Sequence, residues 1–270
     1  MALGPKPDIG GESTDTPPDR QAFGDIVNNL AKRGGVTVER PSPSLSRVNT
    51  VSTLAKLIVA VSLISPSTFA QQDQFPIHPD SKKQPGVPGG KVTQAKFADS
   101  TVYPGTDRDY WIYVPTQYKP GQAASLMVFQ DGKAYVNSAT FNALDNLIHR
   151  GDIPVMIGVF VNPGVVPPQN KNAQARFNRS LEYDDMSDRY SQFLIDELLP
   201  HIERAHGVQF STDPNRRGIT GASSGAICAF NVAWHRPDSF RRVYSTIGTY
   251  VGLRGGGEIP TLIRKTEPKP

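Results

Sequence analysis

The sequence predicts an α/β fold with a mainly parallel sheet. Two continuous apolar runs, at 125–129 and 154–161, are typical of strands covered on both faces. Segments with helical spacing of apolar residues alternate with such runs, and this alternation favours parallel pairing. Apolar and polar residues alternate in 95–103 and 109–114, with a Pro-Gly turn at 104–107, so we expect an antiparallel hairpin at one sheet edge.

Two helices can be placed before the chemistry-bearing part of the chain. Apolar residues at helical spacing predict one helix through 141–148. The longest predicted helix covers 186–204 and has a single apolar stripe. Asp184 or Asp185 is its expected N-cap, and Pro200 is expected to kink or split it near its end.

The N-terminal part of the chain differs from the rest in composition. Residues 1–46 are rich in Pro, Gly, Ser, Thr and Asp without apolar periodicity, so we expect them to be disordered. Residues 47–70 have a basic entry, a short apolar core and small residues before a cut at Gln71, which together predict a secretory signal peptide. The internal position of this signal suggests a true start near Val48 or Val51, with a spurious extension before it.

Composition narrows the function classes. The apolar core within 47–70 is shorter than the roughly 20 residues of a membrane span, so we expect export to the periplasm or the medium. Residues 71–92 are predicted as a Pro/Gly-rich linker and 93–270 as the folded domain. The net charge of +4 arises from scattered basic residues, which argues against a nucleic-acid partner. With one cysteine, Cys228, and no Cys/His cluster at zinc spacing, we expect no disulfide, metal or organic cofactor.

The segment that carries chemistry lies between a strand predicted at 217–220 and a helix predicted at 223–235. It contains Gly-x-Ser-x-Gly, formed by Gly221, Ser223 and Gly225. A serine on a sharp strand-to-helix turn presents its hydroxyl above the sheet, and small flanking residues let the helix approach the strand. We therefore predict that Ser223 is a catalytic nucleophile.

Two backbone amides are expected to bind the oxyanion that forms when such a serine attacks a carbonyl. The amide of Ser224 lies at the N-terminus of the predicted helix, where the helix dipole favours negative charge. In α/β hydrolases the second donor comes from a loop after a sheet strand. Here that loop is Gln-Asp-Gly-Lys after the strand at 125–129, so Lys133 or Gly132 would supply the donor. An ordinary Asp-Gly turn explains this loop equally well.

Four segments together resemble a known esterase family. They are Gln-Asp-Gly at 130–132, Asn-Arg-Ser-Leu-Glu-Tyr at 178–183, the apolar helix at 193–203 and Gly-Ala-Ser-Ser-Gly at 221–225. In this order they resemble the family of enterochelin esterases, feruloyl and other carbohydrate acyl esterases, esterase D and the mycolyltransferases. The similarity covers roughly 91–270 and is strongest to the enterochelin-esterase-like members. It implies an α/β-hydrolase fold and a Ser–acid–His triad.

The sequence departs from this family after the nucleophile. Triad residues in this fold follow the order serine, acid, histidine. After a strand predicted at 241–247 come two acids, Glu258 and Glu267, with no histidine behind them. His235 lies twelve positions after Ser223 on the same predicted helix, which corresponds to about 18 Å. We therefore expect a chain truncated before the triad acid and histidine, without the last strands and helices of the fold.

Two function classes follow from these observations. The first is a serine carboxylic ester hydrolase that acts through an acyl-enzyme at Ser223, on an acylated carbohydrate or a siderophore-type ester. An acyltransferase of the same family would use the same groups. The second is a non-catalytic remnant or ligand-binding module, because a serine without a base is a poor nucleophile. We expect the chain itself to be nearly inactive, and poorly soluble because of an unpaired sheet edge.

Overall fold

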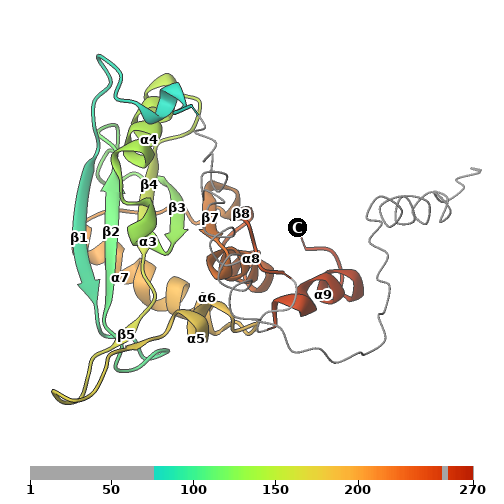
Figure 1. Ribbon diagram of the computed structural model, residues 1–270. Coiled ribbons are helices and arrows are strands. Elements are labelled where there is room, and N and C mark those ends of the chain that lie inside the picture. The colour runs from blue at the N-terminus through green and yellow to red at the C-terminus, as the bar shows by residue number, and fades with distance from the viewer. Residues whose placement is uncertain (1–75, 251–254, 270) are drawn as a thin grey trace, which may run out of the picture. The chain divides into compact units, whose positions relative to one another are not determined.

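The structure is a computed structural model that describes residues 76–250 and 255–269. Its main feature is a six-stranded sheet (Figure 1). The predicted extension at 1–46 and the predicted signal peptide at 47–70 lie outside the described residues. The strand order is β1-β2-β4-β3-β7-β8, in which β2 pairs antiparallel with β1 and β4 and the other pairs are parallel. The predicted mainly parallel sheet with an antiparallel edge hairpin is confirmed.

Most predicted strands lie within a few residues of their expected positions. The sheet strands are β1 (Lys91–Phe97), β2 (Arg108–Val114), β3 (Ser125–Gln130), β4 (Met156–Val161), β7 (Arg217–Ala222) and β8 (Arg242–Thr246). The first hairpin strand is the exception, because it ends at Phe97 and not at residue 103. The chain turns away there because Ser100 Oγ and the Thr101 amide donate to the Glu197 carboxylate, at 2.6 Å and 2.9 Å.

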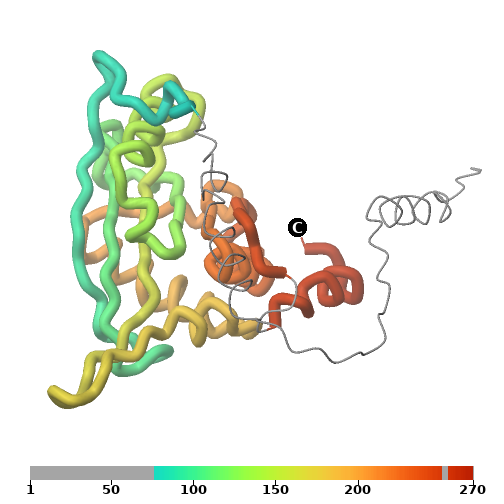
Figure 2. Tube along the Cα trace, viewed as in Figure 1, coloured from blue at the N-terminus to red at the C-terminus, as the bar shows by residue number. Residues whose placement is uncertain are grey.

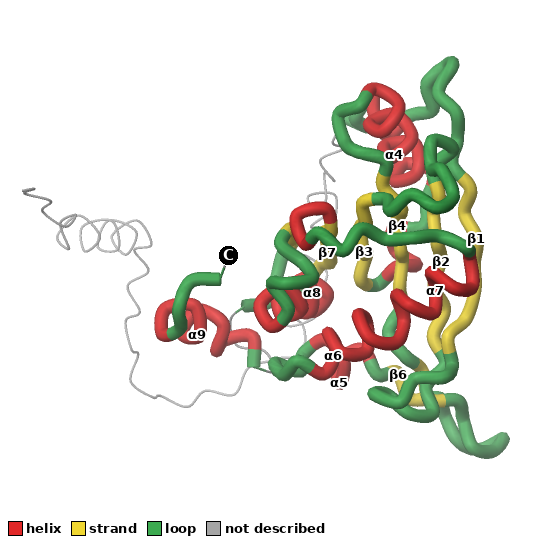
Figure 3. Tube along the Cα trace, turned by 180° about the vertical axis from the view of Figure 1, so that it is seen from behind, coloured by secondary structure: helices red, strands yellow, loops and turns green. Residues whose placement is uncertain are grey.

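Helices cover both faces of the sheet. One face carries α3 (Gly132–Tyr135) and α4 (Ser138–Arg150). The other carries α5 (Arg179–Tyr183), α6 (Arg189–Gln192), the π-helical η2 (Phe193–Leu198), α7 (Leu199–His206) and α8 (Ser224–His235) (Figure 3). The remaining elements are the short η1 (Pro79–Ser81), η3 (Pro214–Arg216) and η4 (Gly256–Glu258), the ribbon of β5 (Val165–Val166) and β6 (Arg176–Phe177), and α9 (Ile259–Lys265).

The core is divided between the two sheet faces. Successive strand residues point to opposite faces, so Val128 joins the cluster under α5–α8 while Phe129 joins the cluster under α3 and α4. Both are nearly inaccessible, at 0% and 9% exposure. Burial on both sides explains why the central strands read as continuous apolar runs.

The long predicted helix runs without interruption from Arg189 to His206, through three stretches that differ in hydrogen-bond spacing. It begins at Arg189, after an N-cap at Asp188, so the expected caps Asp184 and Asp185 precede it. Pro200 has no amide hydrogen to donate, and the turn before it has π spacing, in which the Leu199 amide donates to the Leu194 carbonyl. The helix continues through Pro200 to His206, so the expected split does not occur, and the π-helical stretch before Pro200 is the local change that takes its place.

Residues 76–90, which composition predicts as linker, pack against α4 (Figure 2). The Asn146 side chain donates to the Asp80 and Lys82 carbonyls at 2.8 Å and 2.9 Å, and Arg150 pairs with Asp80 at 2.6 Å. Side-chain amides in α4 thus satisfy backbone groups of a segment that has almost no regular structure of its own.

The two edges of the sheet differ in their surroundings. At β1, two exposed lysines, Lys91 and Lys96, lie near the two ends of the edge strand. At β8, Val243, Tyr244 and nearby Ile247 are exposed by 38%, 65% and 82%, and within the described part of the chain β8 pairs only with β7. No helix among the described residues is long and apolar enough to cross a membrane.

Candidate active site

Ser223 occupies a sharp turn between β7 and α8. Its φ of 55° and ψ of −123° are unusual for a residue with a side chain. Its amide donates to the Thr246 carbonyl of the neighbouring strand at 3.2 Å, and its carbonyl accepts from Ala226 at 3.0 Å as α8 begins. The strand–turn–helix backbone that the sequence predicted around residue 223 is present.

Gly221 and Gly225 allow the strand and the helix to meet at this turn. A Cβ on Gly221 would lie 2.3 Å from the Gly225 carbonyl oxygen, inside any permitted contact. A Cβ on Gly225 would lie 2.9 Å from Asp131 Oδ2. Glycine is therefore required at both positions, because β7 and α8 approach each other too closely for a side chain. The absence of a side chain on Gly225 also lets α8 pack against the loop after β3.

Ser224 is the first residue of α8, so its amide has no acceptor within the helix. The helix has 12 residues and places its N-terminus at the carboxyl end of β7. This end of a helix favours negative charge, which suits the predicted oxyanion donor.

Asp131 forms the second unusual turn of the site, directly after β3. It also has φ of 55°, and its amide donates to the Tyr183 hydroxyl at 3.0 Å. Its carboxylate accepts two hydrogen bonds from Arg179, both of 2.7 Å. Arg179 Nη2 also lies 3.5 Å from the Ala222 carbonyl, so this arginine joins the loop after β3 to the segment before Ser223.

The two residues predicted as second oxyanion donors differ in their contacts. The Lys133 amide donates to Asn162 Oδ1 at 3.0 Å and is already occupied. Gly132 is the first residue of α3 and packs so closely on β4 that an added Cβ would lie 2.4 Å from the Phe160 carbonyl carbon. Its amide has no acceptor within that helix, so Gly132 fits the donor role better than Lys133.

A buried polar cluster supports this wall of the site. Arg108 donates to the Glu182 carboxylate at 2.8 Å and 3.0 Å, and both side chains are fully buried. The Gly164 amide donates to the same carboxylate at 3.1 Å. Glu182 therefore joins β2, the loop after β4 and α5, which carries Arg179 and Tyr183.

The tyrosines behind the loop are neutral hydrogen-bonding groups. Burial raises the pKa of Tyr183 and the pKa of Tyr190 well above their usual value near 10. Tyr190 donates to Gln130 Oε1 at 2.6 Å, and Tyr183 accepts from the Asp131 amide. Sequence reasoning marked Asn-Arg-Ser-Leu-Glu-Tyr only through family resemblance and did not assign Arg179, Glu182 or Tyr183 to the site.

The histidines of the chain make their contacts elsewhere. His235 Nε2 bonds to the Met186 carbonyl at 2.8 Å, and His206 Nε2 bonds to the Tyr110 hydroxyl at 3.0 Å. His201 packs edge-on against Phe97, with ring centroids 4.9 Å apart. All five histidines lie in the described part of the chain, and none of them hydrogen-bonds to Ser223 there.

The other reactive group near the turn is Cys228, which lies one helical turn after Ser224. Burial raises the pKa of its thiol well above the usual range, which disfavours the thiolate nucleophile. Its side chain belongs to the apolar core under α5–α8. Among the described residues, no group of His, Cys, Asp and Glu side chains could hold a metal ion.

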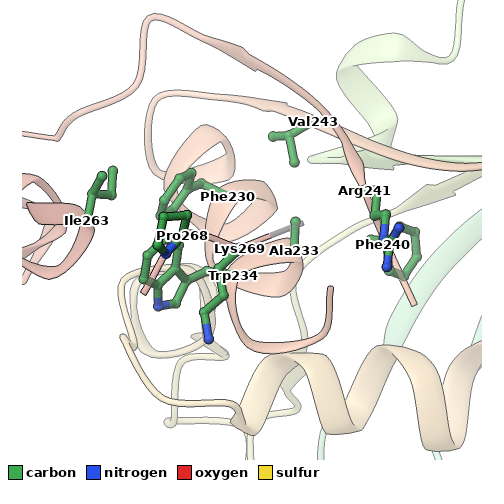
Figure 4. Close-up of a pocket in the computed structure, with 9 residues that line it drawn as sticks. All are labelled: Phe230, Ala233, Trp234, Phe240, Arg241, Val243, Ile263, Pro268 and Lys269. Carbon is green, nitrogen blue, oxygen red and sulfur yellow. The ribbon is translucent and has the colours of Figure 1, made fainter. Parts of the chain in front are cut away.

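Two large cavities open on the described part of the chain. One, of about 630 Å³, adjoins the Asp131–Arg179 pair. The other, of about 580 Å³, lies between α8, β8 and α9 and is lined by stacked Phe230 and Trp234 (Figure 4). Ser223 lines neither cavity, but Arg179 links the first one to the carbonyl of Ala222.

Comparison with known proteins gives a family and a fold. A family model described as "Putative esterase" matches residues 101–250. No curated protein matches the chain. An enterobactin esterase from Shigella flexneri, solved with 2,3-dihydroxy-N-benzoyl-glycine, shares 22% identity, covering 73% of this chain and 46% of its own, with a TM-score of 0.52.

Two further solved structures are similar. An enterochelin esterase from Shigella flexneri shares 20% identity over 67% of this chain and 42% of its own, with a TM-score of 0.51. A ferulic acid esterase from Anaeromyces mucronatus shares 21% identity over 59% and 58%, with a TM-score of 0.46. The chain thus spans less than half the length of the two Shigella structures, which support the α/β-hydrolase type of fold.

The family match extends from the loop before β2 to the segment after β8, which includes Ser223, Asp131 and Arg179. It covers more than half of the chain. The chain therefore belongs to the esterase family.

Proposed function

We propose that this chain carries the nucleophile of a serine carboxylic ester hydrolase, and that Ser223 is this nucleophile. The observation that carries the proposal is the backbone of Ser223, with φ of 55° and ψ of −123° at the junction of β7 and α8. Such a turn holds a hydroxyl clear of the sheet beside a helix N-terminus. Membership of the esterase family supports the same reaction class.

In the proposed reaction, Ser223 Oγ forms a bond to the ester carbonyl carbon while a base removes its proton. The alcohol then leaves with that proton, and water hydrolyses the acyl-serine to release the acid and restore the hydroxyl. The Ser224 and Gly132 amides are the proposed oxyanion donors. The Lys133 amide would have to leave Asn162 to take part, so we assign it no donor role.

The described residues place no base beside Ser223. The three histidines of the α7 and α8 helices are bound or packed away from the turn, and no described side chain hydrogen-bonds to the Ser223 hydroxyl. We infer that this chain has at most trace esterase activity. Binding without turnover is the second candidate function, and the cavity beside Asp131 and Arg179 favours it.

The substrate class and the cellular location of the protein are also proposals. The family resemblance supports an acylated carbohydrate or a siderophore-type ester, and an acyltransferase would use the same acyl-serine. The segment at 47–70 supports secretion or a periplasmic location. N-terminal sequencing of the mature protein should then begin at Gln71, and a product that retains the segment would contradict export by cleavage.

The hydrolysis of para-nitrophenyl acetate tests the catalytic proposal. We expect only trace hydrolysis by this chain. After subtraction of the hydrolysis that imidazole alone causes in buffer, we expect added imidazole, as an exogenous base, to increase a rate that Ser223→Ala lacks. Ser224→Ala serves as the matched control, because its backbone amide is retained. An imidazole-dependent rate that is equal in Ser223→Ala would contradict the nucleophile. Efficient hydrolysis without imidazole, lost in Ser223→Ala, would contradict the missing base.

A further inference from the structure

The cavity beside the Asp131–Arg179 pair is built from three separate segments. Its lining comes from the turn after β3 with α3, the segment from the end of β4 to β5, and the segment from β6 into α5. Its volume of about 630 Å³ is that of a small-molecule site. Arg179 belongs to this lining and lies 3.5 Å from the carbonyl of Ala222, so the cavity is next to the proposed nucleophile.

One wall of the cavity is an apolar ribbon. Val165 of β5 and Phe177 of β6 are directly opposed in antiparallel register, so their side chains project from the same face of the ribbon. Both line the cavity. The Phe177 side chain is 76% exposed, so it is a flat aromatic surface that no described residue covers.

The charges of the lining leave one positive charge unbalanced. The Asp131 carboxylate is neutralised by two hydrogen bonds of 2.7 Å from Arg179. Lys133 is the second cation of the lining, and no described carboxylate pairs with it. Its ammonium lies 5.5 Å from the centroid of the Trp111 ring. An anionic ligand would therefore gain a charge partner here without displacing an existing ion pair.

We propose that this cavity binds the part of an ester substrate that carries a planar ring and one negative charge. The ring packs on Phe177, and the anionic group pairs with Lys133. Phe177 and Lys133 are thus specificity-determining residues on segments that flank the proposed nucleophile. The inference rests on the proposed function only in calling the ligand part of an ester; the binding itself does not require Ser223 to react.

The fluorescence of Trp111 provides a direct test. The chain has two tryptophans, so Trp234→Phe leaves Trp111, beside Lys133, as the only reporter. In the Ser223→Ala, Trp234→Phe protein we expect para-nitrobenzoate, a planar anion, to quench this fluorescence saturably. Cyclohexanecarboxylate, an anion without a planar ring, and para-nitrobenzyl alcohol, a neutral ring, are expected to bind about fivefold or more weakly.

Substitutions in the lining test whether para-nitrobenzoate binds in this cavity or in the one beside α8. We expect Phe177→Ala and Lys133→Ala each to weaken para-nitrobenzoate binding about fivefold, and Lys133→Ala to remove the preference over the neutral alcohol. Leu181→Ala, an exposed leucine outside the cavity, and Lys83→Ala are matched controls that should change nothing.

Two results would overturn the proposal. One is the absence of saturable quenching. The other is equal affinity in Phe177→Ala, Lys133→Ala and the two control proteins. A failure of this binding would leave the imidazole-dependent role of Ser223 untouched, and loss of that role would leave the binding result standing.

Discussion

Ser223 and Asp131 end two neighbouring parallel strands, β7 and β3, and both have φ of 55°. Their surroundings differ. Ser223 is held by its own segment, through Gly221, Gly225 and the start of α8. Asp131 is held by Arg179 and Tyr183, which lie about fifty positions further along the chain. One turn is thus fixed by local close packing, and the other depends on contacts between distant segments.

This difference explains which half of the site the sequence reveals. A non-glycine residue with φ near 55° costs about 1–3 kcal/mol, so something must hold it there. Around Ser223 the restraint comes from closely packed glycines, and their spacing is visible in the sequence. Around Asp131 it is a set of side chains from α5, and their role emerges only when the fold brings them together.

The largest expected effect concerns the distant support of Asp131. Glu182→Ala leaves the fully buried Arg108 without a counter-ion, so we expect a loss of about 3–5 kcal/mol in the free energy of unfolding, measured with urea. The double variant Arg108→Met, Glu182→Leu should recover most of this loss. An unchanged urea midpoint in Glu182→Ala would show that α5 is held without the pair.

The second prediction concerns the local restraint at Ser223. Gly221→Ala would place a Cβ 2.3 Å from the Gly225 carbonyl oxygen, so we expect about 3 kcal/mol of destabilisation in the same urea measurement. Gly89→Ala is the matched control, because its Cβ would meet only Asp145 Oδ2 at 3.7 Å. Equal stability of the two variants would contradict the close approach of β7 and α8.

A smaller effect is expected from one hydroxyl group. Tyr183→Phe removes the acceptor of the Asp131 amide, and we expect a loss of about 1 kcal/mol. Tyr244→Phe is the control, since that ring is 65% exposed on β8 and its hydroxyl makes no hydrogen bond with the described residues. If both variants lose the same stability, the Asp131 turn does not depend on Tyr183.

The smallest effect is a change in the pH dependence of stability. Burial holds the pKa of Tyr183 and Tyr190 well above 10 in the folded chain, whereas the unfolded phenols ionise near 10. Their contribution is therefore complete below pH 10 and is lost as the pH rises above it. We expect urea midpoints to fall above pH 10, less steeply in Tyr183→Phe. A parallel fall in the two proteins would contradict the burial of this phenol.

Much of the fold could be predicted from the sequence. Continuous apolar runs located β3 and β4, and alternation with helices gave the parallel sheet. The predicted end of β1 was wrong. The true end is set by contacts of Ser100 and Thr101 with Glu197, which lies almost a hundred positions further along the chain. The docking of residues 76–90 on Asn146 was missed for the same reason.

In the candidate site, too, features set by local sequence could be predicted and features set by distant contacts could not. The turn at Ser223 and its glycines could be predicted because their spacing reports local geometry. The hydrogen bond from the Lys133 amide to the Asn162 side chain could not be predicted, because Asn162 follows a different strand. Nor could the short ribbon of β5 and β6, whose two-residue strands give no periodic signal.

The most direct test of the central claim is the site of covalent modification by a fluorophosphonate, mapped by mass spectrometry of proteolytic peptides. Because no described side chain hydrogen-bonds to the Ser223 hydroxyl, the reagent is used in excess over long incubation. We predict a single phosphonyl adduct on Ser223 that persists in Ser224→Ala and is absent in Ser223→Ala. An adduct on Ser224, or equal labelling of Ser223→Ala, would contradict the account.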